Sequence, residues 1–322
     1  MHKMMKLAFV ALAVMLSSGA MAAQGYPDRQ VRFVVGFSPG GGTDVVTRMI
    51  ADRLTRAFKQ QVFVDNRPGA ASNIAAELVA TAPADGYTII MGTISTASNY
   101  TLYRHLKYDA LKDFAPVTQV LGTPFLMAIH PSLPPRTVKE FIAFAKRHPG
   151  ELNYGSAGNG SGAHLFAEMF RSLTGVNIVH IPYKGAAPAT TALLSGEVMF
   201  KFDNIVTTLK LARSGKVRAL AVTTTTRSPA APEIPTMKEA GVPGYDASAW
   251  FGVFAPAGTP PEIIERLHAE IAKILKDPKV RQTLLALGGE PVGSTPKEFG
   301  AFFRHEVEKW GKLIRAEKLQ ID

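Results

Sequence analysis

The chain of 322 residues contains no cysteine. It therefore forms no disulfide and no thiolate metal site, and it has no cysteine on which a lipoprotein anchor could be built. The spacings H-x-x-x-H and H-E-x-x-H are also absent, so the sequence predicts no metal site. Without cross-links the hydrophobic core has to stabilise the fold alone, and a chain of this length can bury enough apolar surface to do so.

No apolar run reaches the roughly twenty residues that a membrane-spanning helix needs. At the N-terminus, the basic Lys3 and Lys6 precede a shorter apolar segment at 7–16, and Ala20 and Ala22 supply a small-x-small cleavage site. This order of features is typical of a secretory signal peptide. We expect residues 1–22 to be that signal peptide, with cleavage near Ala22, and the mature chain to be exported.

Acidic residues are fewer than basic ones, with 26 Asp and Glu against 36 Lys and Arg and a formal net charge of +10. Removal of residues 1–22 deletes two lysines and no acid, which lowers this charge to +8. Such a field can steer anionic solutes, a membrane surface or nucleic acid toward a protein. The basic residues are scattered singly, however, and export separates the chain from nucleic acid, so we expect no nucleic-acid partner.

Strand-like apolar runs alternate with amphipathic segments, which is typical of an α/β protein with mainly parallel sheets. The strands are expected at 31–37, 61–64, 87–91, 125–129, 152–154, 177–181, 198–202, 217–222 and 250–254. Thr137, Thr259 and Thr295 each stand three residues before a glutamate, and this spacing predicts a helix start.

The chain is longer than a single doubly wound domain, which predicts two Rossmann-like lobes. The helix-rich segment after Pro260 is expected to cover the first lobe. Lobe 1 would then comprise residues 23–122 and 248–322, and lobe 2 residues 123–247. Crossovers near 120–125 and 222–247 would connect the lobes and leave a ligand cleft between them.

The stretch VRFVVGFSPGGGTDVVTRMI, residues 31–50, predicts a strand, a glycine turn and a helix. Gly40, Gly41 and Gly42 can adopt positive φ and leave N–H groups uncovered at the positive end of the helix. An anion would fit there, although a tight turn that needs glycine for its geometry explains the residues equally well. Asp44 would compete with the anion unless its side chain turns away. Dinucleotide and P-loop fingerprints do not fit these glycines.

A second glycine-rich turn, YGSAGNGSGAH at 154–164, repeats the pattern with Ser161 as a helix cap. Ser161 and His164 could instead be the nucleophile and base of an exported serine hydrolase, but neither serine of the turn lies in a G-x-S-x-G elbow. A histidine that caps or packs against the turn explains His164 without catalysis.

Two further positions are candidates for an anion site. Tyr183, Lys184 and Gly185 lie between a strand and a helix start, and Asp203 ends the strand MFKFD. Tyr183 and Lys184 could face an anion or be a packed tyrosine and a surface lysine. Asp203 could contact a ligand or cap the next helix.

Six segments together resemble the Bug-type extracytoplasmic receptors of tripartite tricarboxylate transport systems: YPDRQVRFVVGFSPGGGTDVVTR, VDNRPGAASNIAAELVATAPADGYTIIMG, LYRHLKYDALKDFAPVTQV, LNYGSAGNGSGAHLFAEMF, VHIPYKGAAPATTALLSGEV and WFGVFAPAGTP. The resemblance covers essentially the whole mature chain. It implies a periplasmic binding protein of type II, a monomer without cofactor or enzymatic activity. Such a receptor closes on a di- or tricarboxylate, an aromatic carboxylate or an acidic amino acid and delivers it to integral-membrane permease subunits. A ligand-sensing partner of a signalling system would use the same binding chemistry.

In that family, backbone amides and ordered waters in two opposed loops hold the carboxylate. The resemblance places these loops at 38–44 and 156–161, and it suggests that 93–98, 183–186 and Asp203 line the cleft. The residues thus expected to bind ligand are Ser38, Pro39, Gly40, Gly41, Gly42, Thr43, Asp44, Thr93, Ser95, Ser156, Ala157, Gly158, Asn159, Gly160, Ser161, His164, Tyr183, Lys184, Gly185 and Asp203.

Two segments near the presumed cleft depart from the family's pattern. The chain has Ala71-Ser72-Asn73-Ile74 where the family often has Gly-Gly-Asn-Ile, and Asn99-Tyr100-Thr101-Leu102-Tyr103 where it often has Asn-Pro-x-Leu-Tyr. The identity of the ligand therefore does not follow from the resemblance.

Overall fold

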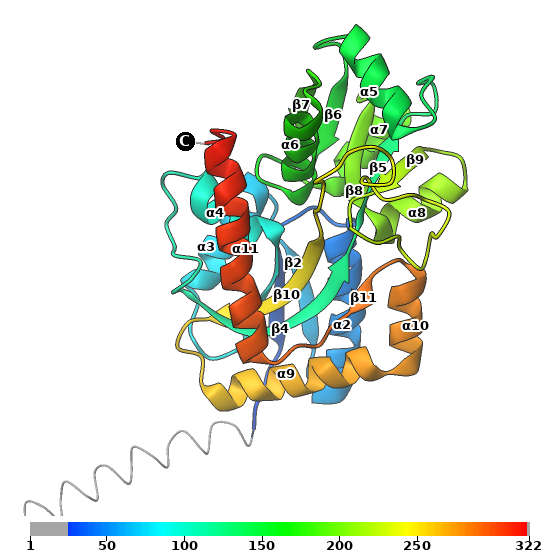
Figure 1. The fold of residues 1–322 in the computed structure, drawn as a ribbon. Coiled ribbons are helices and arrows are strands. Elements are labelled where there is room, and N and C mark those ends of the chain that lie inside the picture. Colours follow the sequence, from blue (N-terminus) through cyan, green and yellow to red (C-terminus); the bar gives the residue numbers. More distant parts are fainter. Residues whose placement is uncertain (1–24, 321–322) are drawn as a thin grey trace, which may run out of the picture.

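The computed structural model describes residues 25–320, so the expected signal peptide at 1–22 lies outside the described residues. Two sheets form the framework (Figure 1). The six-stranded sheet contains β1 (Val31–Val35), β2 (Val62–Asn66), β3 (Thr88–Thr93), β4 (Phe114–Thr123), β10 (Ala249–Pro256) and β11 (Glu290–Pro291), in the spatial order β11-β4-β10-β3-β1-β2. The five-stranded sheet contains β5 (Phe125–Ile129), β6 (Asn153–Ser156), β7 (Val179–Pro182), β8 (Phe200–Asn204) and β9 (Arg218–Val222), in the order β7-β6-β8-β5-β9.

Helices cover both sheets, which confirms the α/β class. The six-stranded sheet and its helices form the lower unit of Figure 1, with α2 (Gly42–Phe58), η1 (Ala70–Ser72), α3 (Asn73–Ala80), α4 (Ile94–Leu102), α9 (Pro261–Lys276), α10 (Pro278–Ala286) and α11 (Pro296–Ala316). The upper unit combines the other sheet with α5 (Val138–Arg147), α6 (Gly162–Thr174), α7 (Ala186–Ser195) and α8 (Ile205–Arg213). Within residues 25–320, no helix has the length and apolar character to cross a membrane.

Both sheets are mixed, so the expectation of mainly parallel sheets was wrong. β1 runs parallel to β2 and β3, and β6 runs parallel to β7 and β8. β10 is antiparallel to β3 and β4, and β5 is antiparallel to β8 and β9. β5 and β10 enter their sheets from a strand of the other unit rather than through a βαβ crossover, and only such a crossover imposes parallel pairing.

The sequence predicts no strand at β4, although β4 is the longest strand described. Pro116, Thr118 and Gln119 interrupt its apolar run, and its pairing with β10 has two register shifts, one at Pro116. Tertiary packing against β10 therefore forms this strand despite an unfavourable local pattern.

Two of the three expected helix starts are confirmed. The hydroxyls of Thr137 and Thr295 accept hydrogen bonds from Glu140 N and Glu298 N, 3.1 and 3.2 Å away. The expectation for Thr259 was wrong, because its hydroxyl donates to Pro256 O and α9 begins only at Pro261.

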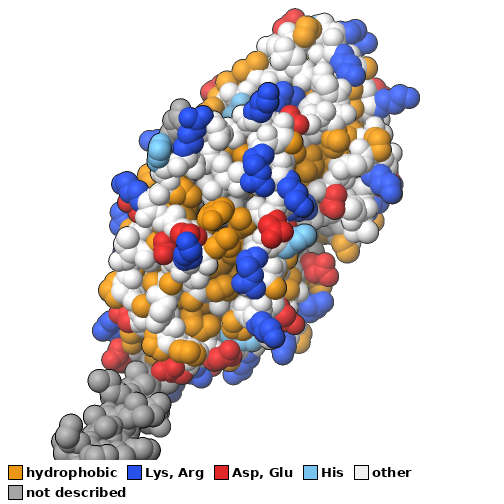
Figure 2. Space-filling view, turned by 60° about the vertical axis from the view of Figure 1, so that its left-hand side comes forward, with side chains coloured by type: hydrophobic (Ala, Val, Ile, Leu, Met, Phe, Trp, Pro, Cys, Tyr) orange, Lys and Arg blue, Asp and Glu red, His pale blue; other side chains and the backbone are white. Residues whose placement is uncertain are grey.

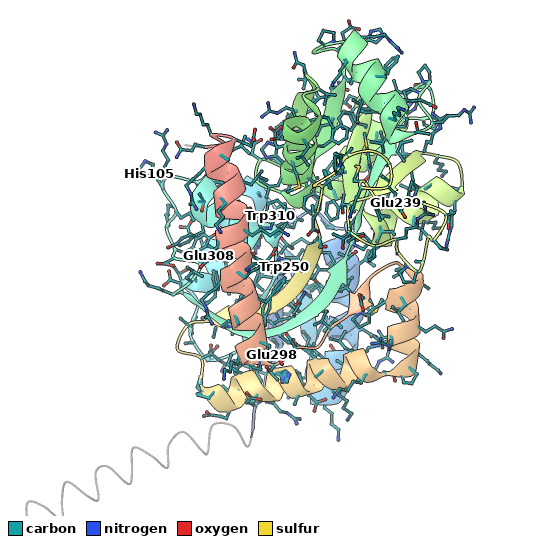
Figure 3. All side chains as sticks on the ribbon, viewed as in Figure 1. His105, Glu239, Trp250, Glu298, Glu308 and Trp310 are labelled. Carbon is teal, nitrogen blue, oxygen red and sulfur yellow. The ribbon has the colours of Figure 1, made fainter. Side chains whose placement is uncertain are left out.

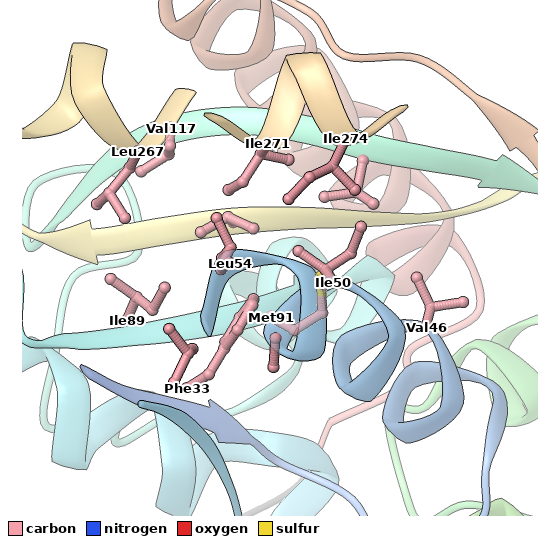
Figure 4. Close-up of a cluster of buried hydrophobic side chains, with 14 of the residues drawn as sticks. Phe33, Val46, Ile50, Leu54, Ile89, Met91, Val117, Leu267, Ile271 and Ile274 are labelled. Atoms are coloured by element: carbon pink, nitrogen blue, oxygen red, sulfur yellow. The ribbon is translucent and has the colours of Figure 1, made fainter. Parts of the chain in front are cut away.

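The core of the lower unit lies between α2, α9 and the six-stranded sheet (Figure 4). Val46, Ile50 and Leu54 of α2 are buried at the helical spacing that the sequence shows. They pack in one cluster with Phe33 of β1 and Ile271 of α9. The core thus fixes the start of α2 against the sheet.

Glu306 joins the two tryptophans of the chain. Its Oε2 accepts hydrogen bonds from Trp250 Nε1 of β10 at 2.9 Å and from Trp310 Nε1 of α11 at 3.0 Å. All three side chains are buried, and Figure 3 shows both tryptophans beside α11. A buried indole N–H without an acceptor costs free energy. The carboxylate of Glu306 therefore stabilises the packing of α11 against the sheet.

We therefore expect Glu306→Ala to lower the free energy of unfolding by about 2–4 kcal/mol, because it leaves two buried indole N–H groups without a partner. The exposed Glu308 on the same helix gives the matched control, and Glu308→Ala should change stability by less than about 0.5 kcal/mol. Urea unfolding followed by tryptophan fluorescence measures both. Equal midpoints for the two variants would refute this role of Glu306.

Candidate functional site

A cavity of about 60 Å³, counted as the space that the centre of a water molecule can occupy, lies between the two units. Since one water needs roughly 10–15 Å³ by this measure, the cavity holds several waters or one small organic molecule. Its lining residues come from both units: Phe37, Gly41, Gly42, Thr43, Thr93, Ile94, Ser95, Phe125, Ala157, Ser161, Gly162, Ala163, Ala186, Lys201, Asp203, Asn204, Ala249, Trp250 and Phe251.

Five helices start at this cavity. Each contributes its cap or first residue to the lining, namely Gly41 of α2, Thr93 of α4, Ser161 of α6, Ala186 of α7 and Asn204 of α8. The first N–H groups of a helix have no partner within it, and the helix dipole places positive potential at the same end. The backbone therefore makes the cavity suited to an anion.

Two buried polar atoms of the lining residues have no hydrogen-bond partner: Ser95 Oγ and Asn204 Nδ2. The other amide atom of Asn204, Oδ1, accepts from Val206 N at 3.0 Å and caps α8. An unpaired buried polar group costs about 1–3 kcal/mol. A bound molecule that accepts from Asn204 and exchanges a hydrogen bond with Ser95 would remove this cost.

Aromatic side chains form part of the remaining wall. Phe37, Phe125, Trp250 and Phe251 all line the cavity. Such rings favour an apolar ligand body and exclude bulk water. The described residues contain no group of His, Cys, Asp or Glu that could hold a metal ion.

The charged residues of the lining, Lys201 and Asp203, form an ion pair with 3.0 Å between Nζ and Oδ2. Both side chains are almost completely buried, at 1% and 2% exposure. Burial lowers the pKa of Lys201, and the neighbouring Asp203 carboxylate opposes this effect. The pair adds no net charge to the cavity.

Asp44 turns away from the cavity, so it does not compete with an anion. Its carboxylate accepts from Gly40 N at 2.9 Å, Arg48 Nε at 3.0 Å and Asn66 Nδ2 at 2.9 Å. Burial alone would raise the pKa of Asp44, but the hydrogen bonds from Arg48, Gly40 and Asn66 outweigh it and lower the pKa. The Asp44 carboxylate thus stabilises the glycine turn. The Gly40 N–H that it binds is not free for a ligand.

The reason for the three glycines differs from the expected one. Only Gly40 has a positive φ, of 84°, whereas Gly41 is extended with φ −77°. A Cβ on Gly42, the first residue of α2, would lie 3.0 Å from Asn204 Cγ of the upper unit. Gly42 therefore permits a close approach between the units and is not required for its own backbone angles.

The units touch each other around the cavity. Ser38 Oγ donates to Lys184 O at 2.8 Å, and Ser98 Oγ donates to Gly160 O at 3.1 Å. A Cβ on Gly185 would lie 2.8 Å from Ser38 N. These contacts join the first glycine turn to the segment at 184–185, and α4 to the second glycine turn, beside the cavity.

The expected ligand-binding residues fall into three groups. The lining of the cavity includes Gly41, Gly42, Thr43, Thr93, Ser95, Ala157, Ser161 and Asp203. Gly158, Asn159, Tyr183 and Lys184 line a second hollow of about 230 Å³, which shares Ala157 with the cavity and is also lined by Gly69, Ala70, Ala71 and Tyr103. Ser38, Pro39, Gly40, Asp44, Ser156, Gly160, His164 and Gly185 lie in or behind the turns and are not among the residues that line either space.

The expected set omitted several lining residues, among them Lys201, Asn204 and Trp250. Lys201 and Asp203 are two residues apart on β8, so their side chains share a face of the sheet. The sequence contains a signal that could have indicated this pair, a lysine two positions before an aspartate in a strand otherwise rich in phenylalanine. Trp250 gave no local signal, because it reaches the cavity only through the pairing of β10 with β4.

His164 and His180 support the second glycine turn from behind. His164 Nδ1 accepts from Gly160 N at 3.1 Å, and its ring stacks on His180 with 4.3 Å between centroids. His180 Nε2 lies 2.6 Å from Ser156 Oγ. Ser161 Oγ accepts from His164 N at 3.4 Å, so this hydroxyl caps α6.

Burial lowers the pKa of His164 to about 4 and of His180 to about 3, with further lowering from Arg171 and from His164 respectively. An unfolded histidine has a pKa near 6.5, so below that pH the unfolded chain binds more protons. The stabilisation is complete above about pH 6.5 and is lost as the pH falls toward 4.

We therefore expect stability to decrease between pH 6.5 and 4.5 with a slope on the order of 1 kcal/mol per pH unit from each histidine. The double variant His164→Asn/His180→Gln should have a flatter profile, whereas His105→Gln at an exposed position should leave the profile unchanged. Urea unfolding at a series of pH values measures this. Profiles of equal slope for wild type and double variant would contradict the burial of neutral imidazoles.

Comparisons with known proteins agree with this geometry. The family model described as "Tripartite tricarboxylate transporter family receptor" matches residues 46–319. Protein BugT of Bordetella pertussis is 38% identical over 297 residues, which cover 92% of this chain and 91% of BugT.

Two solved structures share the fold along nearly their whole length. R. palustris Rpa4515 with adipate gives a TM-score of 0.89 at 41% identity, covering 91% of this chain and 98% of that one. MatC (Rpa3494) from Rhodopseudomonas palustris with bound malate gives a TM-score of 0.86 at 33% identity, covering 90% and 100%. Sequence and fold thus agree along most of the chain, which belongs to the receptor family of tripartite tricarboxylate transporters.

Proposed function

We propose that this protein is a solute receptor that captures a small carboxylate between its two units. The observation that carries the proposal is the cavity between the units at five helix starts, with Ser95 Oγ and Asn204 Nδ2 buried and unpartnered. The ligands named for two relatives, adipate and malate, are both carboxylates. Backbone N–H groups, Ser95 and Asn204 would bind the carboxylate, and the aromatic wall would contact the rest of the ligand.

Family membership supports a route for the ligand. We propose that the signal peptide is cleaved near Ala22, that the mature monomer acts in the periplasm, and that it delivers its ligand to integral-membrane permease subunits. Lobe 1 would comprise residues 23–122 and 248–322, and lobe 2 residues 123–247. The membership of the strands in the two sheets supports this division, since β5 to β9 all lie in the second range.

The serine hydrolase alternative has less support. The family is one of solute receptors, and the Ser161 hydroxyl accepts from the backbone of His164. The stacked His164 ring instead uses Nδ1 to hold Gly160 N. A signalling role would use the same cavity and remains compatible with this proposal.

Calorimetric titration of the mature protein with adipate, malate, citrate and benzoate tests the proposal directly. We expect at least one of these carboxylates to bind. Absence of heat and of any thermal stabilisation with all four would overturn carboxylate capture.

Asn204→Asp should weaken carboxylate binding by about tenfold or more. The substitution keeps the Oδ1 atom that caps α8, but it removes the free Nδ2 donor and adds a negative charge to the cavity. Asn177→Asp, which places the same charge at an exposed position, should leave the affinity unchanged. Equal affinities for the two variants would show that the carboxylate does not lie against Asn204.

Gly185→Ala should also weaken binding by about tenfold, because the added methyl group would hold the units apart at Ser38 N. Gly122→Ala is the matched control, since a Cβ there has no heavy atom within 4 Å. Without ligand, Gly185→Ala should unfold at a lower temperature than Gly122→Ala because the same clash and the φ of 157° strain the free protein, so the titrations are run where both variants are folded. If Gly185→Ala binds as tightly as wild type, the close approach of Gly185 to Ser38 is not needed for capture.

A further inference from the structure

Among the described residues that line the cavity, Asp203 supplies the one carboxylate, and both of its oxygens have partners within the protein. Oδ1 accepts from Asn204 N at 2.9 Å. Oδ2 accepts from Thr208 Oγ1 at 2.8 Å, lies 3.1 Å from Thr190 Oγ1, and pairs with Lys201 Nζ at 3.0 Å. Oδ2 therefore has no position left for a donor from a ligand, Oδ1 already accepts one hydrogen bond, and the charge of the carboxylate is balanced by Lys201.

The ammonium group of Lys201 has all three of its hydrogen-bond donors in use. An ammonium group has three donors. The Nζ of Lys201 lies 3.1 Å from Ala186 O, 2.8 Å from Thr190 Oγ1 and 3.0 Å from Asp203 Oδ2. The lysine therefore compensates Asp203 and has no donor left for a ligand.

This arrangement has a consequence for the kind of carboxylate that fits. An amino acid brings an ammonium group, which needs acceptors when it is buried. The five helix starts offer N–H donors and positive potential, and the charge of Asp203 is already balanced by Lys201, so the carboxylate attracts a second cation only weakly. Lys201 itself would repel a second cation at short range.

We propose that the Lys201–Asp203 pair sets the charge class of the ligand, so that the receptor takes carboxylates without an amino group and rejects their amino-acid analogues. This inference rests on the proposed function and narrows it. Lys201 acts as a specificity-determining residue because it pairs with Asp203 Oδ2 and balances the charge of this carboxylate. It does not contact the ligand's carboxylate.

Matched compounds that differ only in the amino group test this. The mature protein is titrated by calorimetry with succinate and L-aspartate, glutarate and L-glutamate, and 3-phenylpropanoate and L-phenylalanine. In every pair that shows binding, we expect the compound without the amino group to bind at least about tenfold more tightly.

Lys201→Met should reduce this preference about tenfold or more, because it frees Asp203 to accept from an ammonium group and to repel an anion. Lys201→Met/Asp203→Asn removes both charges and should restore a preference close to that of wild type. Lys210→Met, at an exposed position on α8, is the matched control and should change nothing.

The outcomes separate this inference from the proposed function. Equal or tighter binding of the amino acids by wild type overturns the charge-class inference and leaves carboxylate capture standing. An unchanged preference in a folded Lys201→Met variant overturns the role of Lys201. If the single variant does not fold, wild type and the double variant still decide. If wild type binds none of the six compounds and none of the four carboxylates used above, the proposed function fails together with this inference.

Discussion

The start of five helices at one cavity between the units is the constraint on which this structure depends. Each start leaves N–H groups without intrahelical partners, and burial makes this costly. Side chains at the caps satisfy part of the need: Thr93, Ser161 and Asn204 each accept one N–H. Gly41 and Gly185 have no such side chain, so their helices, α2 and α7, depend on other acceptors. The backbone N–H groups at these helix starts thus favour the binding of an anion without help from a charged side chain.

Charge acts at two ranges in this protein. The excess of basic residues is spread over the surface, and on the face in Figure 2 the Lys and Arg side chains lie scattered among acidic and apolar ones. Such a field attracts anions over long distances and weakens with salt. Inside the cavity Lys201 and Asp203 cancel, so helix dipoles and uncharged donors provide the local attraction. This division suits a receptor that must release its ligand again, because a buried unpaired cation would hold an anion too strongly.

The sequence correctly predicted those features of the fold that a local pattern of residues determines. Apolar runs gave most strands, and the spacing of Val46, Ile50 and Leu54 gave the buried face of α2. The two glycine turns were found in the same way. Tertiary contacts determine the rest. Phe251 reaches the cavity because β10 pairs with β3 opposite Thr93, and the need for glycine at position 42 comes from Asn204 of the other unit. No window of the sequence contains both partners of such a contact.

The C-terminal helix α11 contacts a cavity-lining residue of the lower unit and also a helix of the upper unit. Glu306 of α11 accepts a hydrogen bond from Trp250, which lines the cavity from the lower unit. Farther along the same helix, Trp310 packs on Phe166 of α6 with 5.6 Å between ring centroids, and Ser172 donates to Glu317 just beyond the helix at 2.6 Å. A movement that separates the two units would therefore have to break these contacts unless α6 and α11 move together.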